Sequence, residues 1–127
     1  MDNDGRPLAP HLQIYRFPIT AISSITHRIT GALLALGTLA VTYWLIMLAT
    51  GPQAYASARA VFGSAFVQLI MFLWTYALFY HLCNGVRHLG WDLGYGFDLE
   101  RARRSAVAVF VAAGILTLIT WLLAYSH

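Results

Sequence analysis

Three long stretches without a charged residue constrain the fold of this chain more than any other feature. They cover residues 29–58, 60–86 and 105–127, which are 30, 27 and 23 residues long. Each exceeds the ~20 residues that a helix needs to cross a bilayer. Only 10% of the 127 residues are charged and 59% are hydrophobic, so little of the chain is left for a water-soluble core. We predict an all-α membrane protein in which residues 1–127 form one domain with three transmembrane helices.

Proline and glycine indicate where these helices begin and end. Pro18 can occupy the first turn of a helix, and Thr50-Gly51-Pro52 is a strong stop signal. A glycine-rich stretch at 90–96 is typical of a loop after the second helix. We predict spans at about 19–49, 59–90 and 105–125, with a short connection at 53–58.

All eight basic residues are arginines, and they flank the apolar stretches. Seven lie before the first stretch or after the second, and Arg59 alone lies between these two. By the positive-inside rule, the N-terminus and the loop after the second helix are cytoplasmic, and the C-terminus lies on the far side. Topology explains the net charge of +3 better than nucleic-acid binding does. We therefore expect a lipid bilayer, and no nucleic acid, as a partner.

The beginning of the chain bears on its location in the cell. Residues 1–15 contain two aspartates and two prolines and no apolar stretch, unlike a secretory signal or an arginine- and serine-rich transit peptide. We expect the bacterial inner (cytoplasmic) membrane, with a trimmed mature form in the mitochondrial inner membrane as the less favoured alternative. The single cysteine, Cys83, can form no CxxCH attachment, so any haem would be bound non-covalently.

His81 is the residue that most needs an explanation, because ionisable groups are costly inside a membrane span. It lies six residues before Arg87, about 9 Å of helix rise inside the predicted cytoplasmic edge. A neutral imidazole is a good axial ligand for haem iron, and Gly85, one turn later, leaves room for a flat macrocycle. A hydrogen bond from this histidine to a neighbouring helix is about equally compatible with the spacing.

His88 lies two turns after His81 on nearly the same helix face, beside Arg87 and four residues before Asp92. A haem standing upright on His81 would point its propionates at this cationic edge. For Arg87 alone, a position that faces water or lipid headgroups is the simpler interpretation. We expect Asp92 to pair with His88 or with a nearby arginine.

The start of the first helix concentrates hydrogen-bond donors at the predicted cytoplasmic boundary. Ser24 and Arg28 are one turn apart, with Ser23 and His27 beside them. A hydroxyl and a guanidinium at this spacing can bind a carbonyl oxygen and stabilise negative charge on it, as quinone reduction requires. On spacing alone, a helix N-terminus with serine caps and a boundary arginine is the favoured alternative.

Three segments of the chain resemble one known family. They are the segment from Arg6 to Tyr15, the pattern SxxHRxTG at 24–31 and the pattern HxxxGxRHLxxD at 81–92. At this separation in a three-span chain, they resemble the large cytochrome b anchor subunit of succinate dehydrogenase, respiratory complex II. The resemblance covers nearly the whole chain. It implies that the three spans pack with a second three-helix anchor subunit.

The resemblance also implies a haem site. His81 would be an axial ligand of a b-type haem, and a histidine of the companion anchor subunit would be the second axial ligand. His27, Arg28 and His88 would lie near the haem propionates. The metal of this site is the haem iron.

A ubiquinone site is the second implication of the resemblance. Ser24 and Arg28 would line the pocket, with the serine hydroxyl bonded to a quinone carbonyl and Ile25 in apolar contact. The further partners would be an iron–sulfur subunit and a flavoprotein, which carry the iron–sulfur clusters and the flavin that oxidises succinate. The chain would then be a non-autonomous subunit of succinate:ubiquinone oxidoreductase, with no catalysis alone.

Other functions are compatible with parts of this pattern. A fumarate reductase anchor would run the reaction in reverse with menaquinol. A haem-free structural anchor would use His81 only for a hydrogen bond between helices. A small transporter is disfavoured, because the far-side halves of the three predicted spans carry no ionisable residue.

Overall fold

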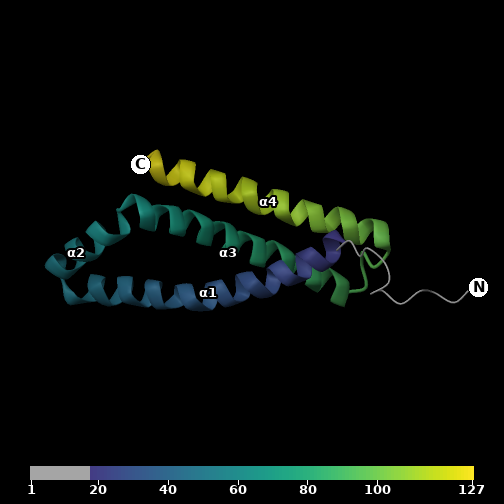
Figure 1. Cartoon of the computed structure of the whole chain (residues 1–127), viewed down its shortest axis with the longest axis horizontal. Coiled ribbons are helices and arrows are strands. Elements are labelled where there is room, and N and C mark those ends of the chain that lie inside the picture. The colour runs from purple at the N-terminus through teal and green to yellow at the C-terminus, as the bar shows by residue number, and fades with distance from the viewer. Residues whose placement is uncertain (1–17) are drawn as a thin grey trace, which may run out of the picture.

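The computed structural model describes residues 18–127, and within them it contains four helices and no strand. The helices are α1 (Ile19–Thr50), α2 (Pro52–Phe62), α3 (Ala65–Asp92) and α4 (Leu99–Tyr125). α1, α3 and α4 are each long and apolar enough to cross a membrane, which confirms the prediction of three spans. Figure 1 shows these three helices running lengthwise beside one another, with the short α2 at one end. The segment from Arg6 to Tyr15 lies outside the described residues.

The connection between the first two spans differs from the prediction. Residues 53–58 are part of α2, and the second span begins at Ala65 instead of residue 59. Gly51, with a φ of 134°, turns the chain in a conformation that glycine adopts readily. Pro52 then begins α2, since its fixed φ suits a first helical turn. The proline read as part of a stop signal is therefore also the start of the next helix.

The third span begins earlier than residue 105. Asp98 caps α4, because its carboxylate accepts a hydrogen bond from the backbone N–H of Arg101 at 3.3 Å. Arg104 also pairs with Glu100 at 2.9 Å on the exposed surface of this first part. The charged segment before the apolar stretch is therefore helical.

Small and hydroxyl-bearing residues form the interior of the bundle. Its buried residues include Thr30, Ala77, Ala106, Ala113 and Thr117. Inside a membrane, helices associate through close packing instead of a hydrophobic driving force, so small residues suit their contacts. Large apolar side chains such as Leu39, which is 70% exposed, point outward. The outer surface is therefore apolar, as expected for spans that face lipid or other helices.

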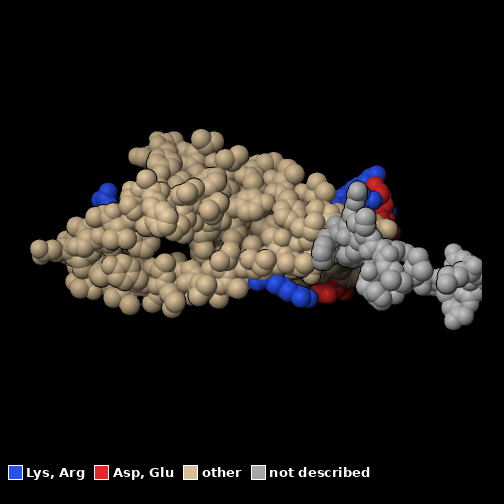
Figure 2. Space-filling view, in the orientation of Figure 1, with Lys and Arg blue, Asp and Glu red and all other residues tan. Residues whose placement is uncertain are grey.

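Charged side chains gather at one end of the molecule, where α3 ends and α4 begins (Figure 2). Among the described residues, Arg59 in α2 is the one charged residue at the opposite end. This distribution agrees with the arginine pattern on which the predicted orientation depends. The assignment of the charged end to the cytoplasm stays a prediction.

α1 and α3 enclose a cavity near α2, away from the charged end. Nε1 of Trp74 donates a hydrogen bond to the carbonyl oxygen of Leu33 at 3.1 Å. Gly37 makes this approach possible, because a Cβ atom there would collide with the indole ring. Beyond this contact, a cavity of about 610 Å³ lies among α1, α2 and α3. None of the site residues predicted from the sequence lines it.

Candidate functional site

His81 projects from α3 against the first half of α1. Its Nδ1 lies 3.2 Å from the carbonyl oxygen of His27 and 3.2 Å from Oγ1 of Thr30. Because a carbonyl oxygen can only accept, the bond to His27 requires the proton of the neutral imidazole to be on Nδ1. Nε2 then carries the lone pair. Histidines that bind metals commonly donate one ring N–H to a carbonyl and use the other nitrogen as the ligand.

Two glycines decide how much space surrounds this imidazole. A Cβ atom at Gly31 would lie 3.1 Å from Cε1 of His81, so glycine is what allows the two helices to approach here. A Cβ atom at Gly85, one turn after His81, would meet nothing within 4 Å. His81 itself is half-buried, and the adjacent Leu82 is 57% exposed. The imidazole therefore packs against α1, and the helix face beside it is open at Gly85.

Two further histidines join His81 at this end of the bundle. The ring of His27 stacks on that of His81, with centroids 4.0 Å apart and 8° between the planes. The ring centroid of His88 lies 5.3 Å from that of His27. Nδ1 of His27 is buried and has no hydrogen-bond partner among the described residues. Buried polar atoms are nearly always paired, so this nitrogen is an exception among the described residues.

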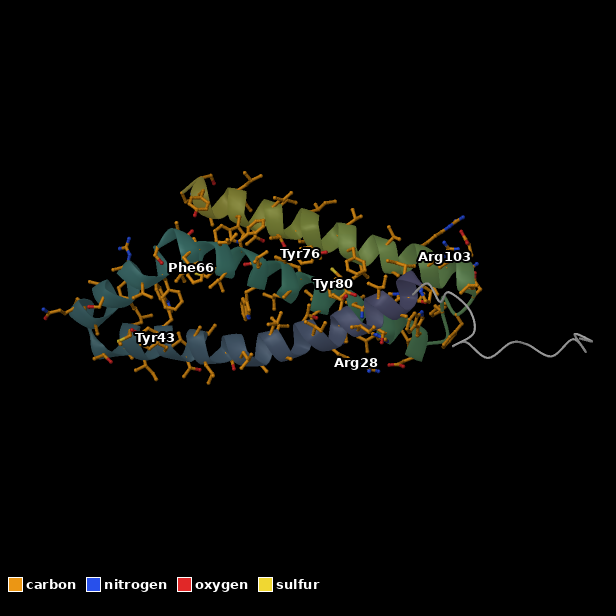
Figure 3. All side chains as sticks on the ribbon, viewed as in Figure 1. Arg28, Tyr43, Phe66, Tyr76, Tyr80 and Arg103 are labelled. Atoms are coloured by element: carbon orange, nitrogen blue, oxygen red, sulfur yellow. The ribbon has the colours of Figure 1, made fainter. Side chains whose placement is uncertain are left out.

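The residues predicted to bind a quinone lie on α1 beside the histidines. Ser24 is half-buried, and its hydroxyl has no hydrogen-bond partner within residues 18–127. Ile25 is 46% exposed. Arg28 is exposed and points away from the other helices (Figure 3). These three side chains are therefore not drawn into the interior of the bundle and can meet a ligand or a partner.

Arg87 does not face water or lipid headgroups, so that expectation is wrong. Its guanidinium donates hydrogen bonds to all three spans. Nε donates to Oγ of Ser105 at 2.8 Å, and Nη2 donates to the carbonyl oxygen of Ala102 at 3.1 Å. Nη1 donates to Oγ of Ser23 at 3.3 Å and to Oδ1 of Asn84 at 3.1 Å. Arg87 therefore joins α1, α3 and α4.

Tyr80 extends this set of bonds. Its hydroxyl donates to the carbonyl oxygen of Ser23 at 2.7 Å and lies 3.0 Å from Oγ of the same serine. Oγ of Ser23 also donates to Oδ1 of Asn84 at 3.1 Å. Ser23, Tyr80 and Asn84 are fully buried. We call these residues the Arg87 network: Ser23, Tyr80, Asn84, Arg87 and Ser105.

Sequence reasoning missed the Arg87 network. One signal was available, since residues 80, 84 and 87 are spaced to form a polar stripe along one face of a helix. The bond partners on α1 and α4 had no comparable signal. Within residues 18–127, Asp92 pairs with neither His88 nor an arginine, so the expected pair with His88 is not formed. A pair of Asp92 with Arg6 or Arg16 stays a prediction, because these arginines lie outside the described residues. The residue that contacts Arg87 and His88 is Trp91. Its ring centroid lies 4.1 Å from Cζ of Arg87 and 4.9 Å from the ring centroid of His88.

The fold and this site define a class of protein: a helical integral membrane protein with a histidine site inside the spans, near one end. The family model described as the succinate dehydrogenase/fumarate reductase transmembrane subunit matches residues 2–120. The chain belongs to this family.

Individual relatives agree with the family assignment. The succinate dehydrogenase cytochrome b556 subunit of Paracoccus denitrificans is 43% identical over 122 residues, which cover 94% of this chain and 92% of that protein. The subunit of the same name from Rickettsia felis is 37% identical, covering 91% of this chain and 90% of that protein. The succinate dehydrogenase cytochrome b560 subunit of Reclinomonas americana is also 37% identical, covering 95% of this chain and 88% of that protein.

Proposed function

We propose that this chain is the membrane-anchor cytochrome b subunit of a succinate:ubiquinone oxidoreductase. It would bind haem b through His81 and form part of the site where ubiquinone is reduced. The observation that carries the proposal is the hydrogen bond from Nδ1 of His81 to the carbonyl oxygen of His27, which leaves Nε2 for the iron. The names of the relatives support the same assignment.

We propose that a partner subunit would supply the second ligand of the haem iron. His27 cannot bind the opposite side of the same iron, because its ring lies flat against His81 and leaves no room for a macrocycle between them. We propose a histidine of the companion anchor subunit, placed against the face of α3 that carries His81 and Gly85. The side chains of His27, Arg28 and His88 would then lie near the propionates. When bound, the haem supplies one-electron redox chemistry.

Ser24, Ile25 and Arg28 would form this chain's share of the quinone site. The Ser24 hydroxyl is available to donate a hydrogen bond to a quinone carbonyl. The Arg28 guanidinium would stabilise the negative charge that develops on that oxygen as electrons arrive, and Ile25 would contact the ring. The electrons would come from succinate through the flavin and the iron–sulfur clusters of the partner subunits.

The relatives bear on the direction of the reaction and on the membrane in which the chain lies. The family model covers both succinate dehydrogenase and fumarate reductase, and the names of the relatives favour succinate oxidation. With the charged end in the cytoplasm, protons and electrons would reach the quinone from the same side. We propose the bacterial inner membrane, which the relatives from Paracoccus denitrificans and Rickettsia felis support; a relative also occurs in Marchantia polymorpha.

The proposal is tested on the purified complex with a dithionite-reduced minus oxidised spectrum and an assay of succinate–quinone reductase. We expect His81→Ala to lose the b-haem signal. Ser24→Ala should keep the haem and lose most quinone reduction, whereas Ser57→Ala, in which an exposed serine of α2 is changed, should behave as wild type. An unchanged spectrum in His81→Ala would refute the ligand assignment. Full quinone reduction in Ser24→Ala would refute the quinone site.

A further inference from the structure

We infer that Arg87 is a positioning residue for the quinone site: it fixes the first turns of α1 against α3 and α4 and so sets the place of Ser24. The inference rests on the proposed function. It adds a residue whose effect on quinone reduction passes through Ser23, to which Arg87 donates a hydrogen bond.

The Arg87 guanidinium is costly where it lies. It is half-buried near the end of a membrane span, and none of its hydrogen bonds among the described residues goes to a carboxylate. A cation in such a place is expected to have a function, because an apolar residue would be cheaper. The guanidinium donates four hydrogen bonds to residues of three helices, so its function is to hold these helices together.

The beginning of α1 depends on these bonds. Pro18, the N-cap residue, makes no side-chain capping bond, so the helix start is not secured by a cap of its own. Ser23 is instead held by its side chain, which accepts from Arg87 at 3.3 Å, and by its carbonyl oxygen, which accepts from Tyr80 at 2.7 Å. These two contacts tie the first turns of α1 to α3.

Ser24 follows Ser23 directly, and its own hydroxyl has no partner within residues 18–127. The position of Ser24 therefore depends on the hydrogen bonds that hold Ser23. A misplacement of about 1 Å at a reacting group can lower a rate roughly 100-fold. A shift confined to the turn at Ser23 and Ser24 would thus weaken quinone reduction. The imidazole of His81 would stay in place, because its contacts on α1 are to His27 and Thr30, later in the helix.

Lysine cannot substitute for this arginine. Nε, Nη1 and Nη2 donate in three different directions from one planar group, whereas a lysine ammonium is a single point donor on a flexible stem. Arg87→Lys therefore keeps the positive charge but cannot donate hydrogen bonds to Ser23, Ala102 and Ser105 at the same time. Arg103, an exposed arginine on α4 that takes no part in the network, is the matched control.

The experiment compares Arg87→Lys, Ser23→Ala and Arg103→Gln in the whole purified complex. Succinate oxidation with an artificial acceptor that reacts at the soluble subunits reports the amount of assembled enzyme. The ratio of quinone reduction to this activity measures how well the quinone site works in each assembled complex. We expect Arg87→Lys to lower the ratio about 10-fold or more and to raise the KM for quinone, with the b-haem spectrum retained. Arg103→Gln should leave the ratio unchanged.

The Ser23→Ala variant tests the route of the effect. Ser23→Ala should also lower the ratio. The double variant with Arg87→Lys should have the same ratio as Arg87→Lys alone, because both substitutions remove the same hydrogen bond between Arg87 and Ser23. An unchanged ratio in both single variants, or additive losses, would overturn the inference. If Arg87→Lys does not assemble, Ser23→Ala decides alone. A normal ratio in Ser24→Ala would instead show that the proposed quinone site is wrong.

Discussion

His27 positions His81 twice, once through its backbone and once through its ring. The carbonyl oxygen of His27 lies 3.2 Å from Nδ1 of His81, and the two rings stack with centroids 4.0 Å apart. The orientation of an imidazole on α3 is therefore decided by α1. Changes on α1 that leave His81 in place should alter how it binds the haem that we propose.

Thr30→Val tests this dependence on α1. The Thr30 hydroxyl lies 3.2 Å from Nδ1 of His81 and donates to the carbonyl oxygen of His27 at 2.9 Å. Because groups that orient a metal-binding histidine typically contribute 10–100-fold to affinity, we expect roughly that loss of haem affinity. Haem content per purified complex, measured after washing in detergent, checks it. Thr38→Val is the control, since the exposed Thr38 hydroxyl bonds to the carbonyl oxygen of Ala35 in its own helix and to no other group within residues 18–127. Equal haem retention in both variants would contradict the prediction.

Gly85→Leu should exclude the haem without disturbing the chain itself. A side chain at this position meets no atom of the described structure within 4 Å of its Cβ, so the helices should pack as before. The same side chain would occupy the open space beside His81. We expect normal amounts of the chain in membranes and a strongly reduced b-haem spectrum. Gly90→Leu, at a second open glycine of α3, should keep the haem. A normal spectrum in Gly85→Leu would place the haem elsewhere.

Gly37→Ala should weaken the contact between α1 and α3. The added methyl group would collide with the Trp74 indole, which donates to the carbonyl oxygen of Leu33. Overpacking of this kind typically costs about 1–3 kcal/mol. We expect a lower thermal midpoint for the detergent-solubilised complex. Gly114→Ala, where the new Cβ would lie 3.9 Å from Tyr76 in ordinary contact, should be close to wild type. Similar midpoints for the two variants would be evidence against the Trp74 contact.

Asp98→Ala should destabilise the start of α4. The Asp98 carboxylate accepts from the backbone N–H of Arg101, and loss of such a cap costs about 1 kcal/mol. Amide hydrogen exchange over residues 99–104 should become faster. Glu100→Gln removes an exposed pair with Arg104 and should have little effect, because surface ion pairs contribute little. Unchanged exchange in Asp98→Ala would mean that tertiary contacts alone hold this end of α4.

The sequence by itself determined the three spans and the candidate site residues. Crossing a bilayer demands about 20 uncharged residues in a row, so α1, α3 and α4 are visible in the charge pattern alone. His81 stood out because an ionisable group inside such a stretch is costly. The motifs around Ser24 and His81 indicated the family, which the comparison with relatives confirmed.

Only the tertiary structure decided what these side chains contact. α2 was missed because Gly51 and Pro52 stop one helix and start another with the same local signals. The environment of Arg87 was misjudged because its partners Ser23 and Ser105 lie on other helices, 64 and 18 residues away in the chain. The position of the proton on His81 likewise depends on a carbonyl oxygen of α1. Hydropathy decides which segments enter the membrane, and it can be read from each segment by itself. Which polar groups come into contact depends on how one helix packs against another, so it cannot be predicted from either segment alone.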